Sequence, residues 1–204
     1  QVRVAARAPG LVAPSSGVFS QDYGSLRRAS ENQSYMARCG LKHGAFGLVN
    51  THWESRYGNS FLAGWPLLAL AAAYAWSGPT PATPRFRAAF SSALTGDTGA
   101  LSALLETMDR IQDRLGKAGV PPGALRSRLF LAGPHLLWRK TTNPLVPAAR
   151  RDLQRLLKQA QRALAQLGSR DPLLREALTL GPTLVGECLA IEEAFDRAWA
   201  DYHQ

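Results

Sequence analysis

The chain has 204 residues, 46% of them hydrophobic, which excludes a disordered protein and suits one domain of ordinary size or a small domain with an appendage. Its formal net charge is +9, and nine basic residues face only three acidic ones within residues 1–96. Arginine supplies most of this excess. A high arginine content also accompanies a GC-rich genome, so the charge alone does not indicate nucleic-acid binding.

The first 40 residues predict a strand followed by a helix. Residues 1–8 alternate apolar and basic side chains, which fits a short strand or a frayed end, and Leu11–Ala13 is a stronger strand candidate before the turn-forming Pro14–Gly17. Apolar residues then recur at helical spacing between Ser25 and Gly40.

The next stretch predicts a second strand and helix. Ala45–Val49 is apolar on both faces, as in a buried strand, and it changes abruptly to polar and aromatic residues from Asn50 to Tyr57. Ser60 can cap a helix that stays apolar from Phe61 to Trp76, which predicts burial on nearly all sides. Two successive strand–helix units predict parallel strands, whose carboxyl ends are the usual place for ligands.

The second strand–helix unit has a pattern that resembles a known enzyme family. The pattern consists of a Gly-Ala-x-Gly strand, a Trp beside a Glu, a polar loop and a Trp-Pro that opens an Ala-rich helix. Residues 10–77 are similar to the last strands and helices of family 20 glycoside hydrolases, the β-N-acetylhexosaminidases, which are (β/α)₈ barrels. The resemblance implies that Trp53 lines the −1 sugar and that Glu54, Asn50 and Arg56 bind its hydroxyls. It also implies that Tyr23 reaches in from the preceding loop.

The catalytic residues of that family are not visible in this sequence. Its general acid belongs to an Asp-Glu pair, and no such pair occurs in the chain. The chain is therefore expected either to be the tail of a longer enzyme or to be a non-catalytic relative. Because neighbouring strand residues face opposite sides, only one of His52 and Trp53 can point inward, and we expect Trp53 to do so.

Residues 77–84, with three prolines and a glycine, predict a boundary. We expect a barrel portion in residues 1–78, a linker in 79–84 and a helical domain in 85–204. In the last part the patterns predict helices at 86–94, 98–115, 125–138, 143–167, 173–180 and 182–203. The fold class is thus mainly α with a small α/β part.

The basic helical part supports an alternative function, a non-catalytic interaction module that binds nucleic acid or protein. The Arg-rich face of residues 150–162 contains no aromatic side chains for base stacking, so a solvated face is favoured over nucleic-acid binding. Likewise Glu192, Glu193 and Asp196 fit a solvated face, with Ile191, Phe195, Ala198 and Trp199 as the core stripe.

Nothing in the sequence indicates a cofactor, a metal or a membrane. Cys39 and Cys188 lie far apart and share no ligand spacing with histidines, which argues against a disulfide framework or a zinc site. The apolar run that ends at Trp76 is shorter than the ~20 residues that span a bilayer. No signal peptide is visible, which favours a cytoplasmic location. The expected partners are an N-acetylhexosamine-containing glycan and an upstream barrel segment.

Overall fold

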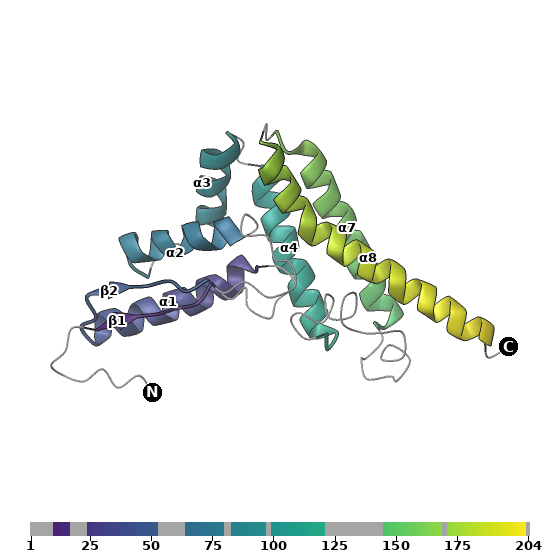
Figure 1. Cartoon of the computed structure of the whole chain (residues 1–204), viewed down its shortest axis with the longest axis horizontal. Helices are drawn as coiled ribbons and strands as arrows, with labels where there is room; N and C mark the ends of the chain where they lie inside the picture. The colour runs from purple at the N-terminus through teal and green to yellow at the C-terminus, as the bar shows by residue number, and fades with distance from the viewer. Residues whose placement is uncertain are drawn as a thin grey trace.

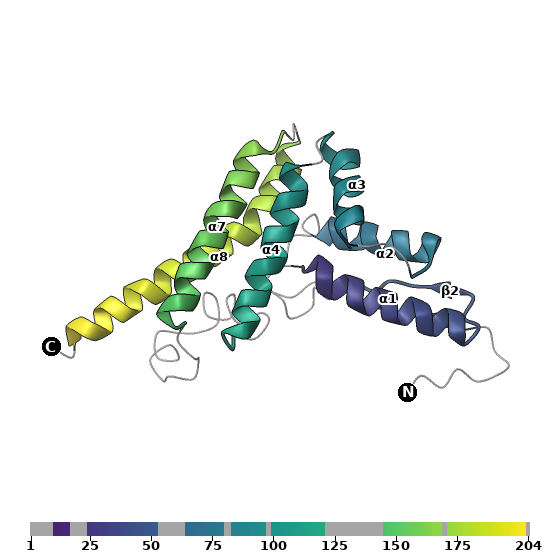
Figure 2. The same cartoon turned by 180° about the vertical axis from the view of Figure 1, so that it is seen from behind.

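The structure is a computed structural model that describes residues 10–16, 24–52, 64–79, 83–96, 99–120, 145–168 and 171–202. Its elements in chain order are β1 (Leu11–Val12), α1 (Leu26–Lys42), β2 (Gly47–Leu48), α2 (Trp65–Ser77), α3 (Thr83–Thr95), α4 (Ala100–Lys117), α7 (Pro147–Gln166) and α8 (Pro172–Tyr202). The described protein is therefore mainly helical with a small α/β part, as predicted. The two strands lie with α1 and α2 at one end of the molecule, and α4, α7 and α8 pack together at the other (Figures 1 and 2).

The two strands are parallel, as the two strand–helix units predict. Leu11 pairs with Gly47 and Val12 with Leu48, and a further parallel bridge joins Ser15 to Thr51. The carboxyl ends of the two strands therefore meet at one edge.

The helix between the strands begins at a side-chain cap. The Ser25 hydroxyl accepts a hydrogen bond from the Arg28 amide, which satisfies one of the free amides of the first turn of α1. The predicted helix is confirmed and runs two residues beyond Gly40. Its buried face repeats at helical spacing and consists of Leu26, Ala29, Gln33, Ala37 and Gly40.

Two predictions of complete burial are wrong. The predicted strand Ala45–Val49 is regular only at Gly47–Leu48, and Phe46 and Val49 are 69% and 48% exposed. Among the described residues the sheet has only two strands, so no neighbour covers them. The described part of the predicted helix 61–76 begins with α2, and Trp76 is 93% exposed. The face of α2 that packs against α1 buries Leu67, Leu70 and Tyr74.

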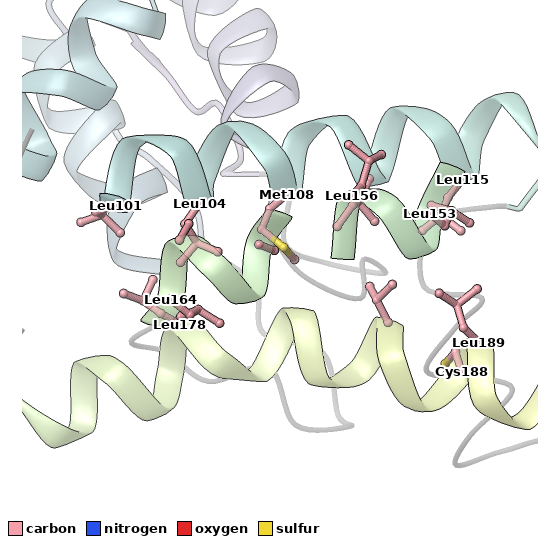
Figure 3. Packing of buried hydrophobic residues seen from close by; sticks show 14 of the residues in the cluster. Leu101, Leu104, Met108, Leu115, Leu153, Leu156, Leu164, Leu178, Cys188 and Leu189 are labelled. Carbon is pink, nitrogen blue, oxygen red and sulfur yellow. The ribbon is translucent and has the colours of Figure 1, made fainter. Parts of the chain in front are cut away.

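The larger core lies between α4, α7 and α8 (Figure 3). The helices predicted for residues 98–115 and 143–167 correspond to α4 and α7, whose apolar stripes face each other. Among the buried side chains in this core are Leu101, Leu104, Ile111, Leu153, Leu156, Val185 and Leu189. Because burial of apolar surface is the dominant favourable term in folding, this larger core contributes more to the stability of the described molecule than the smaller one does.

The structure corrects some boundaries of the helical part. The helices predicted for 173–180 and 182–203 form the single helix α8, which continues through Pro182. It does so because Leu178 and Val185, on either side of the proline, are both buried in the core. Ala198, which the sequence placed in a core stripe near the end of α8, is exposed. The helix predicted for 125–138 lies outside the described residues.

The division into domains stays a prediction. Helix α3 begins at Thr83, so Pro84 of the predicted linker occupies a first helical turn, where proline is tolerated. The smaller core of α1 and α2 also contacts Phe86 of α3 and Leu105 of α4, so the two ends of the molecule touch. In the part of the chain that the structure describes, no helix is long and apolar enough to cross a membrane.

Candidate functional site

The carboxyl edge of β1 and β2 is the place where the sequence predicts a sugar site. Of the five predicted sugar-binding residues, the structure describes Asn50, while Tyr23, Trp53, Glu54 and Arg56 lie outside the described residues. Residues 14–16 and 50–52, which precede the undescribed segments, form the edge itself. The Thr51 amide donates to the Pro14 carbonyl at 2.8 Å, and the Ser16 amide donates to the Thr51 carbonyl at 2.9 Å.

Four side chains at this edge form a continuous hydrogen-bonded chain. Gln33 Nε2 donates to Asn50 Oδ1 at 3.3 Å, and Asn50 Nδ2 donates to Ser16 Oγ at 3.1 Å. Ser16 Oγ lies 3.0 Å from His52 Nδ1. We call Gln33, Asn50, Ser16 and His52 the polar chain. It joins the middle of α1 to the ends of both strands.

The polar chain lies on the face of the sheet that the helices cover. Val12 of β1 contacts Gly40 of α1, because a Cβ atom on Gly40 would come within 3.1 Å of the Val12 methyl groups. Alternation along the strand then puts Ser16 on the same face as Val12. The hydrogen bond from Gln33 holds Asn50 on this face too. His52 follows Asn50 by two residues, so it lies on the helix-covered face as well.

Sequence reasoning found Asn50 and considered His52, but it missed Ser16 and Gln33. Gln33 is fully buried, and its Oε1 has no described hydrogen-bond partner. The sequence did hold a signal for it, since Gln33 is the one polar side chain in the otherwise apolar stripe of α1. Ser16 stood in a turn-like Pro-Ser-Ser-Gly segment, and nothing in that pattern distinguished it from a loop serine.

The Ser16–His52 distance would suit a nucleophile and its base, but the surroundings favour another role. Ser16 is fully buried, and its hydroxyl is already engaged by Asn50 and lies 3.0 Å from the Thr51 carbonyl. A nucleophile must be open to its substrate, so this arrangement serves to hold the strand ends in position. Asn50 likewise uses both ends of its amide inside the protein.

A second buried polar cluster lies at the start of α1. Asp109 of α4 accepts hydrogen bonds from the Ser25 hydroxyl at 2.8 Å and from the Arg27 amide at 3.3 Å. The Arg87 guanidinium of α3 lies 3.8 Å from its other oxygen. Burial raises the pKa of the Asp109 carboxyl, while the Ser25 and Arg27 hydrogen bonds and the Arg87 charge act to lower it.

This second cluster joins the two ends of the molecule. A carboxylate at the amino end of α1 interacts favourably with the helix dipole and with the free amides of the first turn. Arg27 also pairs with Asp113 of α4, and Arg87 pairs with Glu106 at 3.2 Å. Helix α4 is thereby attached to both α1 and α3.

Comparison of the chain with protein-family models, with curated proteins and with solved structures finds no match. The described residues also contain no group of three or more side chains that could hold a metal ion. Cys39 and Cys188 form no disulfide with each other. The carboxyl edge of β1 and β2, with the sequence that follows it, is therefore the candidate site of this protein.

Proposed function

We propose that the carboxyl edge of β1 and β2 is part of a sugar-binding site for N-acetylhexosamine, in a protein similar to the β-N-acetylhexosaminidases. The observation that carries the proposal is the parallel pairing of Ser15 with Thr51. Because the strands end together, the segments that begin at residues 17 and 53 start from the same edge. These segments contain all of the predicted sugar-binding residues except Asn50.

The orientation of the strand ends supports Trp53 as the residue that contacts the sugar. His52 lies on the helix-covered face, where its ring is 3.0 Å from Ser16. Since successive strand residues alternate, we expect Trp53 on the opposite face. An indole ring there can stack on the apolar face of a sugar, and the neighbouring Glu54 and Arg56 carry groups that bind hydroxyls. Asn50, on the helix-covered face, supports the site indirectly, because it holds Ser16 in place beside His52.

The exposed apolar side chains of the sheet support the idea that this is the end of a (β/α)₈ barrel. Leu11 is 50% exposed, and its side chain lies over Gly47, on the face away from Val12. Val49 follows Gly47 by two residues and is also largely exposed. In a complete barrel this face would pack against side chains from other strands. We therefore propose that an upstream barrel segment covers it and supplies the catalytic Asp-Glu pair.

The resemblance implies a reaction in which the acetamido group of the substrate is the nucleophile, one of the exceptions to hydrolysis by two carboxylates. This chain would contribute binding, because it contains no Asp-Glu pair. The alternative, a basic helical module that binds nucleic acid or protein, is less well supported. Two arginines of the basic face are paired with acidic residues, Arg150 with Asp196 and Arg155 with Asp152.

A pair of tryptophan substitutions tests the proposal. We expect Trp53→Ala to abolish measurable binding of N-acetylglucosamine in a calorimetric titration and to lower the melting temperature little, because an aromatic ring in an open site adds little to the core. Trp76→Ala is the matched control, since Trp76 is 93% exposed and lies on α2, away from the strand ends. It should leave both quantities unchanged. If Trp53→Ala instead costs ~3–5 kcal/mol of stability, Trp53 is a core residue and the assignment is wrong.

A further inference from the structure

The ring of His52 lies directly against Gly64, the residue that caps the start of α2. A Cβ atom at position 64 would be 2.3 Å from His52 Cε1 and 2.7 Å from His52 Nε2, closer than real Cβ contacts. The backbone of Gly64 is in the ordinary right-handed region, with φ −83°. Glycine is therefore required here by the close approach of the imidazole and not by its dihedral angle.

Ser16 lies beside the Nδ1 atom of the same ring. A serine hydroxyl donates one hydrogen bond and accepts two. Ser16 Oγ has three neighbours at hydrogen-bonding distance, namely Asn50 Nδ2, the Thr51 carbonyl and His52 Nδ1. All three bonds form together only if Ser16 donates to the Thr51 carbonyl and accepts from both Asn50 and His52. This arrangement requires the proton of His52 to be on Nδ1.

Turning both amides of the polar chain over does not change this result. Gln33 would then accept from Asn50, and Asn50 would accept the hydroxyl proton of Ser16. His52 Nδ1 would again have to be the donor to Ser16. The hydrogen-bonding capacity of Ser16 therefore favours the Nδ1–H form of His52 in either arrangement.

The start of α2 favours the same form. The ring atoms of His52 that lie closest to Gly64 are Cε1 and Nε2, and with the proton on Nδ1 a neutral His52 carries a lone pair on Nε2. The amino end of a helix carries a partial positive charge, which a lone pair stabilises and an added proton would oppose. Helix α2 has no side-chain cap of its own at Gly64.

From these contacts we propose that His52 is a positioning residue, which fixes the carboxyl end of β2 against the start of α2 as a neutral Nδ1–H imidazole. Ser16, Asn50 and Gln33 hold the ring in that orientation. The inference rests on the proposed function in one respect, because the residue after His52 in the chain is Trp53, which we propose to contact the sugar. A positioning error of about 1 Å at such a residue can reduce function about 100-fold.

The protonation of His52 tests the first half of the proposal. In long-range ¹H–¹⁵N spectra of the whole chain, we expect the His52 signals to show the Nδ1–H form, and Ser16→Ala to shift the population toward Nε2–H. Thr51→Val is the matched control, because it removes the Thr51 hydroxyl bond to the Pro14 carbonyl at the same edge without touching the polar chain. It should leave the His52 signals unchanged. Finding the Nε2–H form in the wild-type protein would overturn the proposal.

A double-mutant cycle tests the contact between His52 and Gly64. We expect Gly64→Ala to lower the melting temperature in the wild-type protein and much less so in the His52→Ala background, where the clash is gone. Equal losses in the two backgrounds would refute the contact. His52→Ala should also weaken N-acetylglucosamine binding at least about tenfold, with Thr51→Val near wild type. If the wild-type chain binds no sugar, the proposed function fails, while the protonation state and the cycle still decide the inference.

Discussion

Two buried polar residues, Gln33 in the middle of α1 and Asp109 beside its start, have distinct roles. Gln33 connects the helix to the strand ends, and Asp109 of α4 receives hydrogen bonds from Ser25 and Arg27 at its start. Each satisfies groups that would be costly to bury alone. The sequence signals differ as well, since Gln33 interrupts an apolar stripe, whereas Asp109 lies among the apolar positions of α4 next to Met108.

The raised pKa of Asp109 leads to a prediction on pH. Because burial raises this pKa above the unfolded value, the folded state binds the proton more tightly. The stability that this gives is present below the ordinary Asp pKa and is lost as the pH rises through the folded pKa. Asp109→Asn cannot ionise and still accepts from Ser25. We therefore expect its melting temperature to rise relative to the wild type as the pH increases from about 4 to 7.

The comparison needs a control for the general effect of removing a carboxylate. Asp152→Asn serves, since Asp152 is on α7, is not among the groups that act on Asp109, and forms partly exposed pairs with Arg114 and Arg155. Exposed pairs contribute about 0–1 kcal/mol, so this variant should follow the wild type across the pH range. A difference between Asp109→Asn and the wild type that stays constant with pH would show that ionisation of Asp109 does not matter.

Among the elements, α7 carries the packing of the helical end. Leu153 is fully buried between α4 and α8, so Leu153→Ala should lower the free energy of unfolding by about 2–5 kcal/mol through lost burial and a remaining cavity. Leu173→Ala is the control, because Leu173 is 62% exposed on α8 and should cost less than about 0.5 kcal/mol. Urea denaturation followed by circular dichroism measures both. Equal costs would contradict the described core.

Sequence patterns predicted the helices that have one apolar face. The apolar spacings of α1, α4 and α7 gave positions within a few residues of the observed ends. Segments that are apolar on all sides gave wrong predictions of burial. Ala45–Val49 and the run that ends at Trp76 indicated packing neighbours that the described chain does not contain. The helix break predicted before Pro182 is also wrong, since packing on both sides of the proline outweighs its tendency to interrupt a helix. The contact of His52 with Gly64 depends on tertiary structure and had no local signal.

At the scale of the whole molecule, the two ends differ in how much they bury. Among the residues that the structure describes, the core of α4, α7 and α8 contains twenty buried residues, whereas that of α1 and α2 contains five. We therefore expect residues 1–80 expressed alone to be insoluble or molten, and residues 85–204 to stay helical. Near-UV circular dichroism and thermal melting of each segment provide the measurement. A cooperative melt of the first segment would show that it needs neither the Asp109 contacts nor further strands.

The most direct test of the central claim is a titration of the ¹⁵N-labelled chain with N-acetylglucosamine, followed by amide chemical shifts. We expect saturable shifts concentrated at Ser16 and at residues 50–52, the edge where the parallel strands end. Amides of α7, on the basic face, should not move. Shifts confined to α7 and α8, or no saturable shifts at all, would contradict a sugar site at the carboxyl edge of β1 and β2.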